Sequence, residues 1–364
     1  MPLRILSTCS ARPNFVKLAA LHHALLQKRS AFEHVIVHTG QHYDPLLSDI
    51  FFTQLQIPQP DFNLGVRGGS HRKEVILLTE QAMLPVLASV KPDLVLVYGD
   101  VNGAVGAARA AKTLGISIGH VEAGLRSGDM EMPEEHNRIE IDRLANLLFV
   151  SEQSGMDHLQ QEGCTGRAHL VGNTMIDTLI RMLPLIRTQA VPVGLPERCG
   201  LLTLHRPSNV DDPKMLAELL LFFRQIDPSV PLVLPVHPRL AHVLSKGATG
   251  SVPANIHLVS PLGYLEFLSL LSRSLFVLTD SGGIQEEAVL LGKRCFTLRR
   301  NTERPSTIDS GSNILIDPSK AEDRQMVIDF AKHPQEVHVT VPPLWDGHAG
   351  ERILAEIARF SSAS

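Results

Sequence analysis

The sequence predicts an α/β protein made of two Rossmann-like domains that face a shared cleft. Short runs rich in Val, Ile and Leu alternate with longer amphipathic stretches, as in parallel sheets covered by helices. The alternation restarts after a segment rich in proline and glycine near the middle of the chain. The length of 364 residues also suits two domains of roughly 150 residues each.

In the first half, short apolar runs predict strands that are buried on both faces of a sheet. The predicted strands are Arg4–Cys9, His34–Thr39, Asp93–Tyr98, Ser117–Val121, Leu147–Val150 and His169–Val171. Between them, hydrophobic residues recur at helical spacing. The predicted helices are Asn14–Gln27, His71–Ala88, Asn102–Thr113 and Glu134–Asn146.

The second half repeats this organisation. Its predicted strands are Leu201–Leu204, Leu232–Val236, Ile256–Val259, Leu275–Thr279 and Cys295–Leu298. Its predicted helices are Lys214–Arg224, Tyr264–Leu271 and Gly283–Leu291. A linker is expected at Thr188–Cys199, and a final amphipathic helix at Gly350–Phe360. We therefore expect an N-terminal domain over residues 1–170, a C-terminal domain over 171–347, and a terminal helix within 348–364 that packs back on the first domain.

Composition excludes several classes of protein. The formal net charge is −4, whereas general nucleic-acid binders carry a basic excess. The four cysteines lie far apart, so neither a zinc knuckle nor a disulfide framework is indicated. The N-terminus has no signal-peptide pattern, and no apolar stretch is long enough to span a membrane. These features predict a soluble cytoplasmic protein.

Polar residues collect where the predicted strands end, which is where open α/β sheets bind ligands. After the first strand, a tight turn and a helix start predict an anion site to which Arg12 and Lys17 add positive charge. Ordinary surface cations would explain both residues equally well. The turn contains no dinucleotide or P-loop fingerprint.

Carboxylates follow two strands that should be buried. Asp100 and Glu122 each stand at a strand end, where an unsatisfied charge is expensive, so function is favoured over loop capping. Glu134 and Glu135 follow Pro133, and favourable interaction with the positive end of a helix dipole would explain them. Glu135 could also pair with Arg138 at helical spacing.

In the second half, His205 with Arg206 follows the first strand and His237 follows the second. Their spacing does not match a zinc site, so no metal is predicted. An apolar strand then ends in Asp-Ser-Gly-Gly, and a helix starts at once. Ser281, Gly282 and Gly283 suit a diphosphate at the helix N-terminus, although a capped helix with a glycine turn is the simpler alternative.

Together these segments resemble the non-hydrolysing UDP-N-acetylglucosamine 2-epimerases. The matching pieces are Ala11-Arg12-Pro13 with Lys17, Thr39–His42, Tyr98–Asp100, His120–Arg126, Pro133–Arg138, His205-Arg206, Pro235–His237, Thr279–Glu287, Thr302–Pro305, and Asp346-Gly347 with Arg352-Ile353. They stand in the family's order along nearly the whole chain, so the set is far more specific than any one motif.

The resemblance implies a fold like that of GT-B glycosyltransferases and inversion at C2 of a UDP-linked 2-acetamido sugar, UDP-N-acetylglucosamine to UDP-N-acetylmannosamine. UDP would leave to give a bound 2-acetamidoglucal and then add back after the proton returns to the other face of C2. No cofactor is implied. The resemblance also implies a homodimer that acts on a nucleotide sugar in the biosynthesis of cell-surface polysaccharide.

It further implies roles for particular residues. Asp100, Glu122 and Glu134 would be the acid, base and stabilising carboxylates, and His205 with Arg206 would assist departure of the diphosphate. The expected substrate-binding residues are Arg12, Lys17, Gln41, His42, Arg206, His237, Phe267, Ser281, Gly282, Gly283, Glu287 and Arg304. Among these, Glu287 would hold the ribose, Phe267 would lie near the uracil, and Arg304 would lie at the nucleotide end.

The chain departs from the family pattern in places. Ser10, Val101 and Ser208 replace a common Gly, Thr and Glu. Residues 67–71 read Arg-Gly-Gly-Ser-His where some members carry an Arg-Gln pair that binds an activating second UDP-sugar, so such activation is not expected.

The Gly-Gly-Ser-His stretch also resembles relatives that act on UDP-2,3-diacetamido-2,3-dideoxy-glucuronate. A hydrolysing epimerase, a GT-B glycosyltransferase and a catalytically silent UDP-sugar-binding protein are further alternatives.

Overall fold

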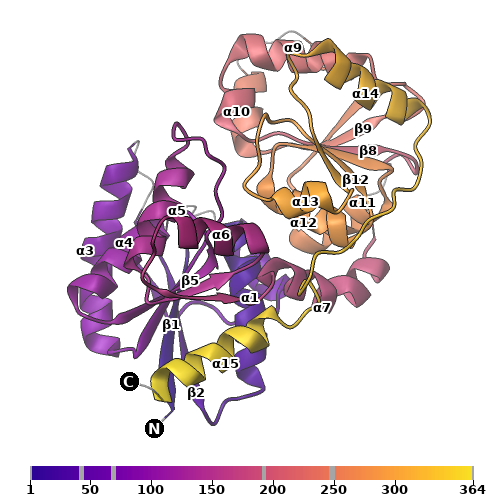
Figure 1. Cartoon of the computed structure of the whole chain (residues 1–364). Helices are drawn as coiled ribbons and strands as arrows, with labels where there is room; N and C mark the ends of the chain where they lie inside the picture. The colour runs from indigo at the N-terminus through magenta and orange to yellow at the C-terminus, as the bar shows by residue number, and fades with distance from the viewer. Residues whose placement is uncertain (1, 41–44, 67–70, 191–193, 246–250, 363–364) are drawn as a thin grey trace. The chain divides into compact units, whose positions relative to one another are not determined.

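The chain divides into two compact units (Figure 1). The computed structural model describes all residues except 1, 41–44, 67–70, 191–193, 246–250 and 363–364. Unit 1 comprises Met1–Met182 and Pro343–Ser364, and unit 2 comprises Leu183–Pro342. The division falls at residue 182 rather than at the expected 170, because helix α7 (Thr174–Thr188) begins in unit 1 and its last residues belong to unit 2.

Unit 1 is built on a seven-stranded parallel sheet in the order β3-β2-β1-β4-β5-β6-β7. Its central strands consist of buried apolar residues, as expected for a sheet covered on both faces. The strands are β1 (Leu3–Cys9), β2 (Phe32–His38), β3 (Phe62–Asn63), β4 (Leu94–Tyr98), β5 (Ser117–Ala123), β6 (Leu147–Val150) and β7 (Arg167–Leu170).

Helices cover this sheet, with α3 and α4 on one side and α1 and α15 on the other (Figure 1). The helices are α1 (Arg12–Leu26), α2 (Pro45–Gln54), α3 (Arg72–Val90), α4 (Asn102–Thr113), α5 (Pro133–Leu144), α6 (Gln153–Gln161), α7 and α15 (Ala349–Ser362). The terminal helix α15 packs on α1, and a Cβ at Gly350 would lie 2.8 Å from the carbonyl oxygen of Ala20. The Asp177 carboxylate accepts the Gly350 N–H at 2.8 Å, which fixes the start of α15.

Unit 2 has a six-stranded parallel sheet in the order β10-β9-β8-β11-β12-β13, the strand order of a Rossmann fold. The strands are β8 (Gly200–Thr203), β9 (Leu232–Pro235), β10 (Ile256–Val259), β11 (Phe276–Thr279), β12 (Arg294–Thr297) and β13 (Asn313–Leu315). The helices are α8 (Pro207–Val210), α9 (Pro213–Arg224), α10 (Pro238–Ser245), α11 (Tyr264–Arg273), α12 (Gly282–Leu290), α13 (Pro305–Asp309) and α14 (Ala321–Lys332). The expectation of two Rossmann-like units is confirmed.

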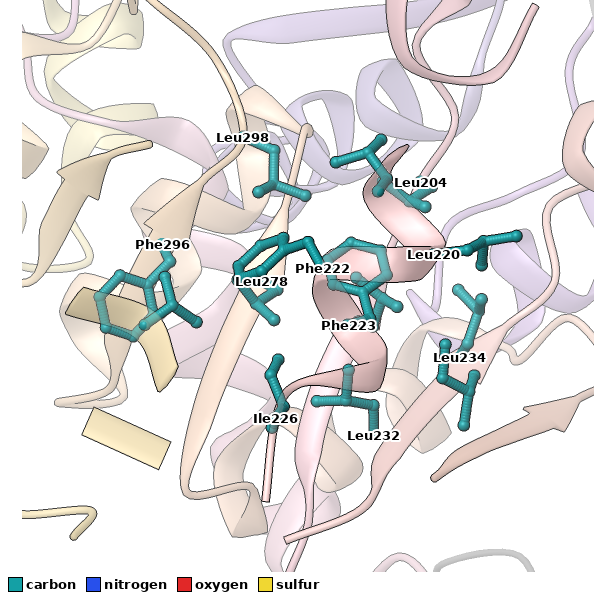
Figure 2. Packing of buried hydrophobic residues seen from close by; sticks show 14 of the residues in the cluster. Leu204, Leu220, Phe222, Phe223, Ile226, Leu232, Leu234, Leu278, Phe296 and Leu298 are labelled. Atoms are coloured by element: carbon teal, nitrogen blue, oxygen red, sulfur yellow. The ribbon is translucent and has the colours of Figure 1, made fainter. Parts of the chain in front are cut away.

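One face of the second sheet is closed by a tightly packed apolar cluster (Figure 2). Phe222 and Phe223 of α9 lie 5.2 Å apart between ring centroids and pack with Leu278 and Phe296 from the sheet. This cluster holds α9 against the strands and so fixes the strand ends that carry polar residues.

The described part of the chain contains no helix that is both long and apolar enough to cross a membrane.

Replacing Phe223 by alanine tests the importance of this cluster. Phe223 is fully buried, so Phe223→Ala should lower the free energy of unfolding by about 3–5 kcal/mol through lost burial and a cavity. Urea denaturation followed by circular dichroism measures the change. Leu221→Ala on the same helix is the control, since Leu221 is 55% exposed and should have little effect. Equal destabilisation by both variants would contradict the packing described.

Candidate active site

Several of the predicted site residues follow the carboxyl ends of strands next to the topological switch point of each sheet. In unit 1 the strand order reverses between β1 and β4, and in unit 2 between β8 and β11. Asp100 follows β4, His205 follows β8, and Ser281 follows β11. Crevices at such points are the usual ligand sites of open α/β sheets.

Glu122 has an unusual backbone in unit 1. It lies at an irregularity in β5, between Val121 and Ala123, and its φ of 73° is in the left-handed region that side chains disfavour. Its carboxylate forms an ion pair with Lys17 of α1. Both side chains are more than nine-tenths buried. The ion pair therefore offsets the free energy that an unpaired, desolvated carboxylate would cost at this position.

Asp100 is held beside the same turn. Its carboxylate lies 2.8 Å from Nη2 of Arg138, and its backbone carbonyl accepts a hydrogen bond from Asn137 at 2.7 Å. The Asp100 side chain remains 29% exposed, whereas that of Arg138 is buried. A fixed, partly exposed carboxylate of this kind can reach a ligand without giving up its partner.

Gly99 brings these groups together. Its φ is 62°, and a Cβ there would lie 2.8 Å from Nζ of Lys17 and 3.0 Å from the Glu122 carboxylate. Only glycine fits this conformation and this close approach without strain. The turn before Asp100 therefore lies directly against the Lys17–Glu122 pair.

The two successive glutamates of α5 have different environments. Glu134 is exposed, while Glu135 is buried and accepts N–H groups from Ser127 and Gly128 near 3.0 Å. Glu135 also pairs with Arg138, as the helical spacing predicted. Of the two, only Glu134 has a side chain accessible to a ligand.

The turn after β1 differs from an ideal anion site. The Asn14 side-chain oxygen accepts the N–H groups of Ser10 and Ala11, and Pro13 has no N–H to offer. Positive charge at this turn thus comes from the side chain of Arg12. Its Cζ atom lies 5.4 Å from the centroid of the Phe51 ring. Lys17, which the sequence also predicts to bind the substrate, is buried beside Glu122.

Asp280 organises the strand ends of unit 2. Its fully buried carboxylate accepts from Nδ1 of His205 at 2.7 Å, from the N–H groups of His205 and Arg206, and from the Asn209 amide. Burial alone would raise the pKa of Asp280, but His205 and these hydrogen bonds outweigh it and lower the pKa to about 2. The ionised carboxylate directs the opposite ring nitrogen of His205, Nε2, away from itself.

Helix α12 begins directly after Asp280, with Ser281 at its N-cap. Glycine is favoured at position 282, because an added Cβ would collide with the Arg304 guanidinium and the Glu303 carboxylate. Arg304, expected at the nucleotide end, is buried behind this turn in ion pairs with Glu286 and Glu303. The first turn of α12 still presents backbone N–H groups and the positive end of the helix dipole.

Glu287 is buried one turn into α12. Burial, together with the charge of the adjacent Glu286, raises the pKa of Glu287 to about 8. The folded chain therefore holds this carboxyl largely protonated at neutral pH. A buried polar group of this kind is stabilised when a ligand supplies hydrogen bonds.

The remaining predicted residues have less distinctive surroundings. His237 is exposed, lies 5.8 Å from the His205 ring between centroids, and accepts the Arg239 N–H. Phe267 is partly buried on α11 and Arg206 is partly buried before α8. Gln41 and His42 lie outside the described residues.

The sequence patterns did not identify the buried aspartates Asp142 and Asp280 as site residues. Asp142 accepts from His120 Nδ1 at 2.6 Å. A histidine in the middle of the apolar run of β5 was the available signal, because a buried imidazole needs a partner. Asp280 stood at the start of the Asp-Ser-Gly-Gly motif.

A family model described as UDP-N-acetylglucosamine 2-epimerase matches residues 24–358. The chain belongs to this family. The prediction from its ordered motifs is confirmed, and the family name denotes an isomerase. A Pseudomonas aeruginosa protein named UDP-2,3-diacetamido-2,3-dideoxy-D-glucuronate 2-epimerase is 39% identical over 339 residues, which cover 91% of this chain and 92% of that protein.

Solved structures of family members share the fold. The Methanocaldococcus jannaschii UDP-GlcNAc 2-epimerase in complex with UDP-GlcNAc and UDP has a TM-score of 0.89 and 32% identity, covering 98% of this chain and all of that one. The Neisseria meningitidis UDP-GlcNAc 2-epimerase bound to UDP-GlcNAc has a TM-score of 0.87 and 28% identity, with the same coverage.

Glu287→Gln should stabilise the unliganded chain in a pH-dependent way. Because the folded-state pKa of Glu287 is about 8, against an ordinary 4.5, folding takes up a proton between these values. Stability then falls as pH rises through this window, by up to about 1.4 kcal/mol per pH unit. The variant escapes this loss, so its gain in melting temperature should grow from pH 5 to pH 8. Exposed Glu218→Gln is the control, and a pH-independent gain would contradict the buried acid.

Proposed function

We propose that the chain inverts C2 of a UDP-linked 2-acetamido sugar by elimination and re-addition of UDP, interconverting UDP-N-acetylglucosamine and UDP-N-acetylmannosamine. The observation that carries this proposal is the pair of carboxylates at the carboxyl ends of the neighbouring strands β4 and β5, Asp100 and Glu122, each paired with its own cation. Removing a proton from one face of C2 and returning it to the other requires an acid and a base.

The reaction balances without another reactant. A base removes the C2 proton while the bond between C1 and the UDP oxygen breaks, leaving a C1–C2 double bond in a 2-acetamidoglucal. A proton then adds to the opposite face of C2, and the UDP oxygen bonds again to C1. Asp100, Glu122 and Glu134 are the proposed acid, base and stabilising carboxylates, because carboxylates also stabilise the positive charge that develops at C1.

Unit 2 is proposed to hold the nucleotide. The first turn of α12, at Ser281–Gly283, would bind the diphosphate, and the Glu287 carboxyl would hydrogen-bond to the ribose hydroxyls. His205 would assist the leaving phosphate through Nε2, because its Nδ1 is engaged by Asp280. Proposed contacts from Arg12, Lys17, Arg206, His237, Phe267 and Arg304 complete the binding set.

A second candidate substrate is UDP-2,3-diacetamido-2,3-dideoxy-glucuronate. The 39% identity to the Pseudomonas aeruginosa protein named for that sugar favours it. Both substrates share the UDP group and the reacting C2 centre, and they differ in their substituents at C3 and C6.

We also propose that the protein is a homodimer. Light scattering at micromolar concentration tests this proposal.

Incubation with each sugar in D₂O, followed by NMR, tests the reaction. The proposed function predicts deuterium at C2 with UDP still attached, and the sugar that exchanges faster is the substrate. Free sugar together with UDP would indicate a hydrolysing epimerase instead. UDP binding with no exchange in either sugar would indicate a silent binding protein.

Asp100→Asn should lower turnover at least about a hundredfold, the typical contribution of a positioned acid or base. The amide keeps the shape of the side chain but cannot accept a proton. Coupled measurement of the C2 epimer formed gives the rate. The matched control is Asp157→Asn, an exposed aspartate on α6 of the same unit. Turnover near that of the wild type would remove Asp100 from the mechanism.

A further inference from the structure

His120 is a fully buried histidine whose two ring nitrogens both face hydrogen-bond acceptors. Nδ1 lies 2.6 Å from the Asp142 carboxylate, and Nε2 lies 2.9 Å from the carbonyl oxygen of Gly99. A neutral imidazole has only one N–H, so it could satisfy one of these partners and would leave two acceptors facing each other at the second. Both contacts are satisfied when the ring carries two protons and a positive charge.

The surroundings of Asp142 keep it ionised. Burial alone would raise its pKa, but the charges and hydrogen bonds of His120 and Arg126 outweigh burial, and the pKa lies below its ordinary value. Nη2 of Arg126 lies 2.8 Å from the second carboxylate oxygen, which also accepts the Gly124 N–H at 3.1 Å. An ionised carboxylate can only accept, so the His120 nitrogen that faces it must donate.

This pair contacts the backbone on both sides of the candidate carboxylates. The Gly99 carbonyl, bonded by His120, belongs to the residue directly before Asp100. The Gly124 N–H, bonded by Asp142, lies two residues after Glu122. Gly99 and Glu122 both have left-handed backbones, with φ of 62° and 73°, and such conformations persist only where surrounding contacts fix them.

We propose that Asp142 is a positioning residue that acts through a positively charged His120 to hold the backbone of Asp100 and Glu122 in the reactive arrangement. The inference rests on the proposed function, in which these two carboxylates move the C2 proton. Neither Asp142 nor His120 needs to touch the sugar, because both are fully buried beneath the turn. Their effect on the reaction is through geometry.

The charge of His120 is tested directly by NMR of the wild-type chain labelled with ¹⁵N-histidine, without substrate. Two N–H protons on one ring, with imidazolium nitrogen shifts at pH 7.5, are expected. Asp142→Asn should assign this signal, because the neutral amide removes the charge that stabilises the imidazolium and the ring should lose one proton. A neutral His120 ring in the wild-type chain would overturn the proposal.

Kinetics of Asp142→Asn test the positioning role. We expect kcat to fall about a hundredfold, since a misplacement of roughly 1 Å of reacting groups has effects of this size, while KM changes less than about twofold. Calorimetry should still give one UDP bound per chain, which separates lost positioning from a loss of folded protein. Wild-type kcat, or a fall in kcat matched by a fall in binding stoichiometry, would overturn the proposal.

Asp177→Asn is the matched control. Asp177 is also a buried carboxylate of unit 1 that accepts a backbone N–H, but it holds the start of α15. Its substitution should leave kcat within about twofold of the wild type. If the wild-type chain exchanges C2 in neither sugar, the proposed function fails, whereas the NMR measurement still decides the charge of His120.

Discussion

A buried aspartate that stays ionised organises the carboxyl edge of each sheet. Asp142 in unit 1 and Asp280 in unit 2 are both fully buried, and each accepts Nδ1 of a histidine together with backbone N–H groups. In both, these donors lower the pKa against the opposing effect of burial. Because a buried charge is destabilising unless its donors stay in place, these contacts hold the strand-end loops in one arrangement.

The same constraint explains why glycines stand beside the candidate residues. Gly99 lies against the Lys17–Glu122 pair, and Gly282 lies against Arg304 and Glu303. Charged groups that must be close to satisfy one another leave no room for a Cβ between them. Glycine at these two positions therefore lets the carboxylates and the helix N-terminus lie at the strand ends while the Lys17–Glu122 and Arg304–Glu303 ion pairs form directly beside them.

Much of the fold followed from local patterns in the sequence. The buried runs predicted most strands, and Asp100 and Glu122 were recognised because carboxylates follow strands that should be buried. Helix α7 was not predicted, because a proline such as Pro184 disfavours a helix locally. Tertiary packing stabilises the helix in spite of this proline. Strand β13 has only three residues, too few for a pattern. The partners of buried charges, such as Arg304 with Glu286, depend on contacts that no local pattern encodes.

In the proposed reaction, the bond between C1 and UDP breaks and forms again within the bound complex. Substrate labelled with ¹⁸O in the bond between C1 and the β-phosphorus tests it most directly, because freed UDP can rotate its terminal phosphate before it adds back. Elimination and re-addition of UDP predict that the label moves to non-bridging phosphate positions, seen by ³¹P NMR, at a rate comparable to that of C2 epimerisation. Epimerisation with the label fixed in the bridge would contradict it.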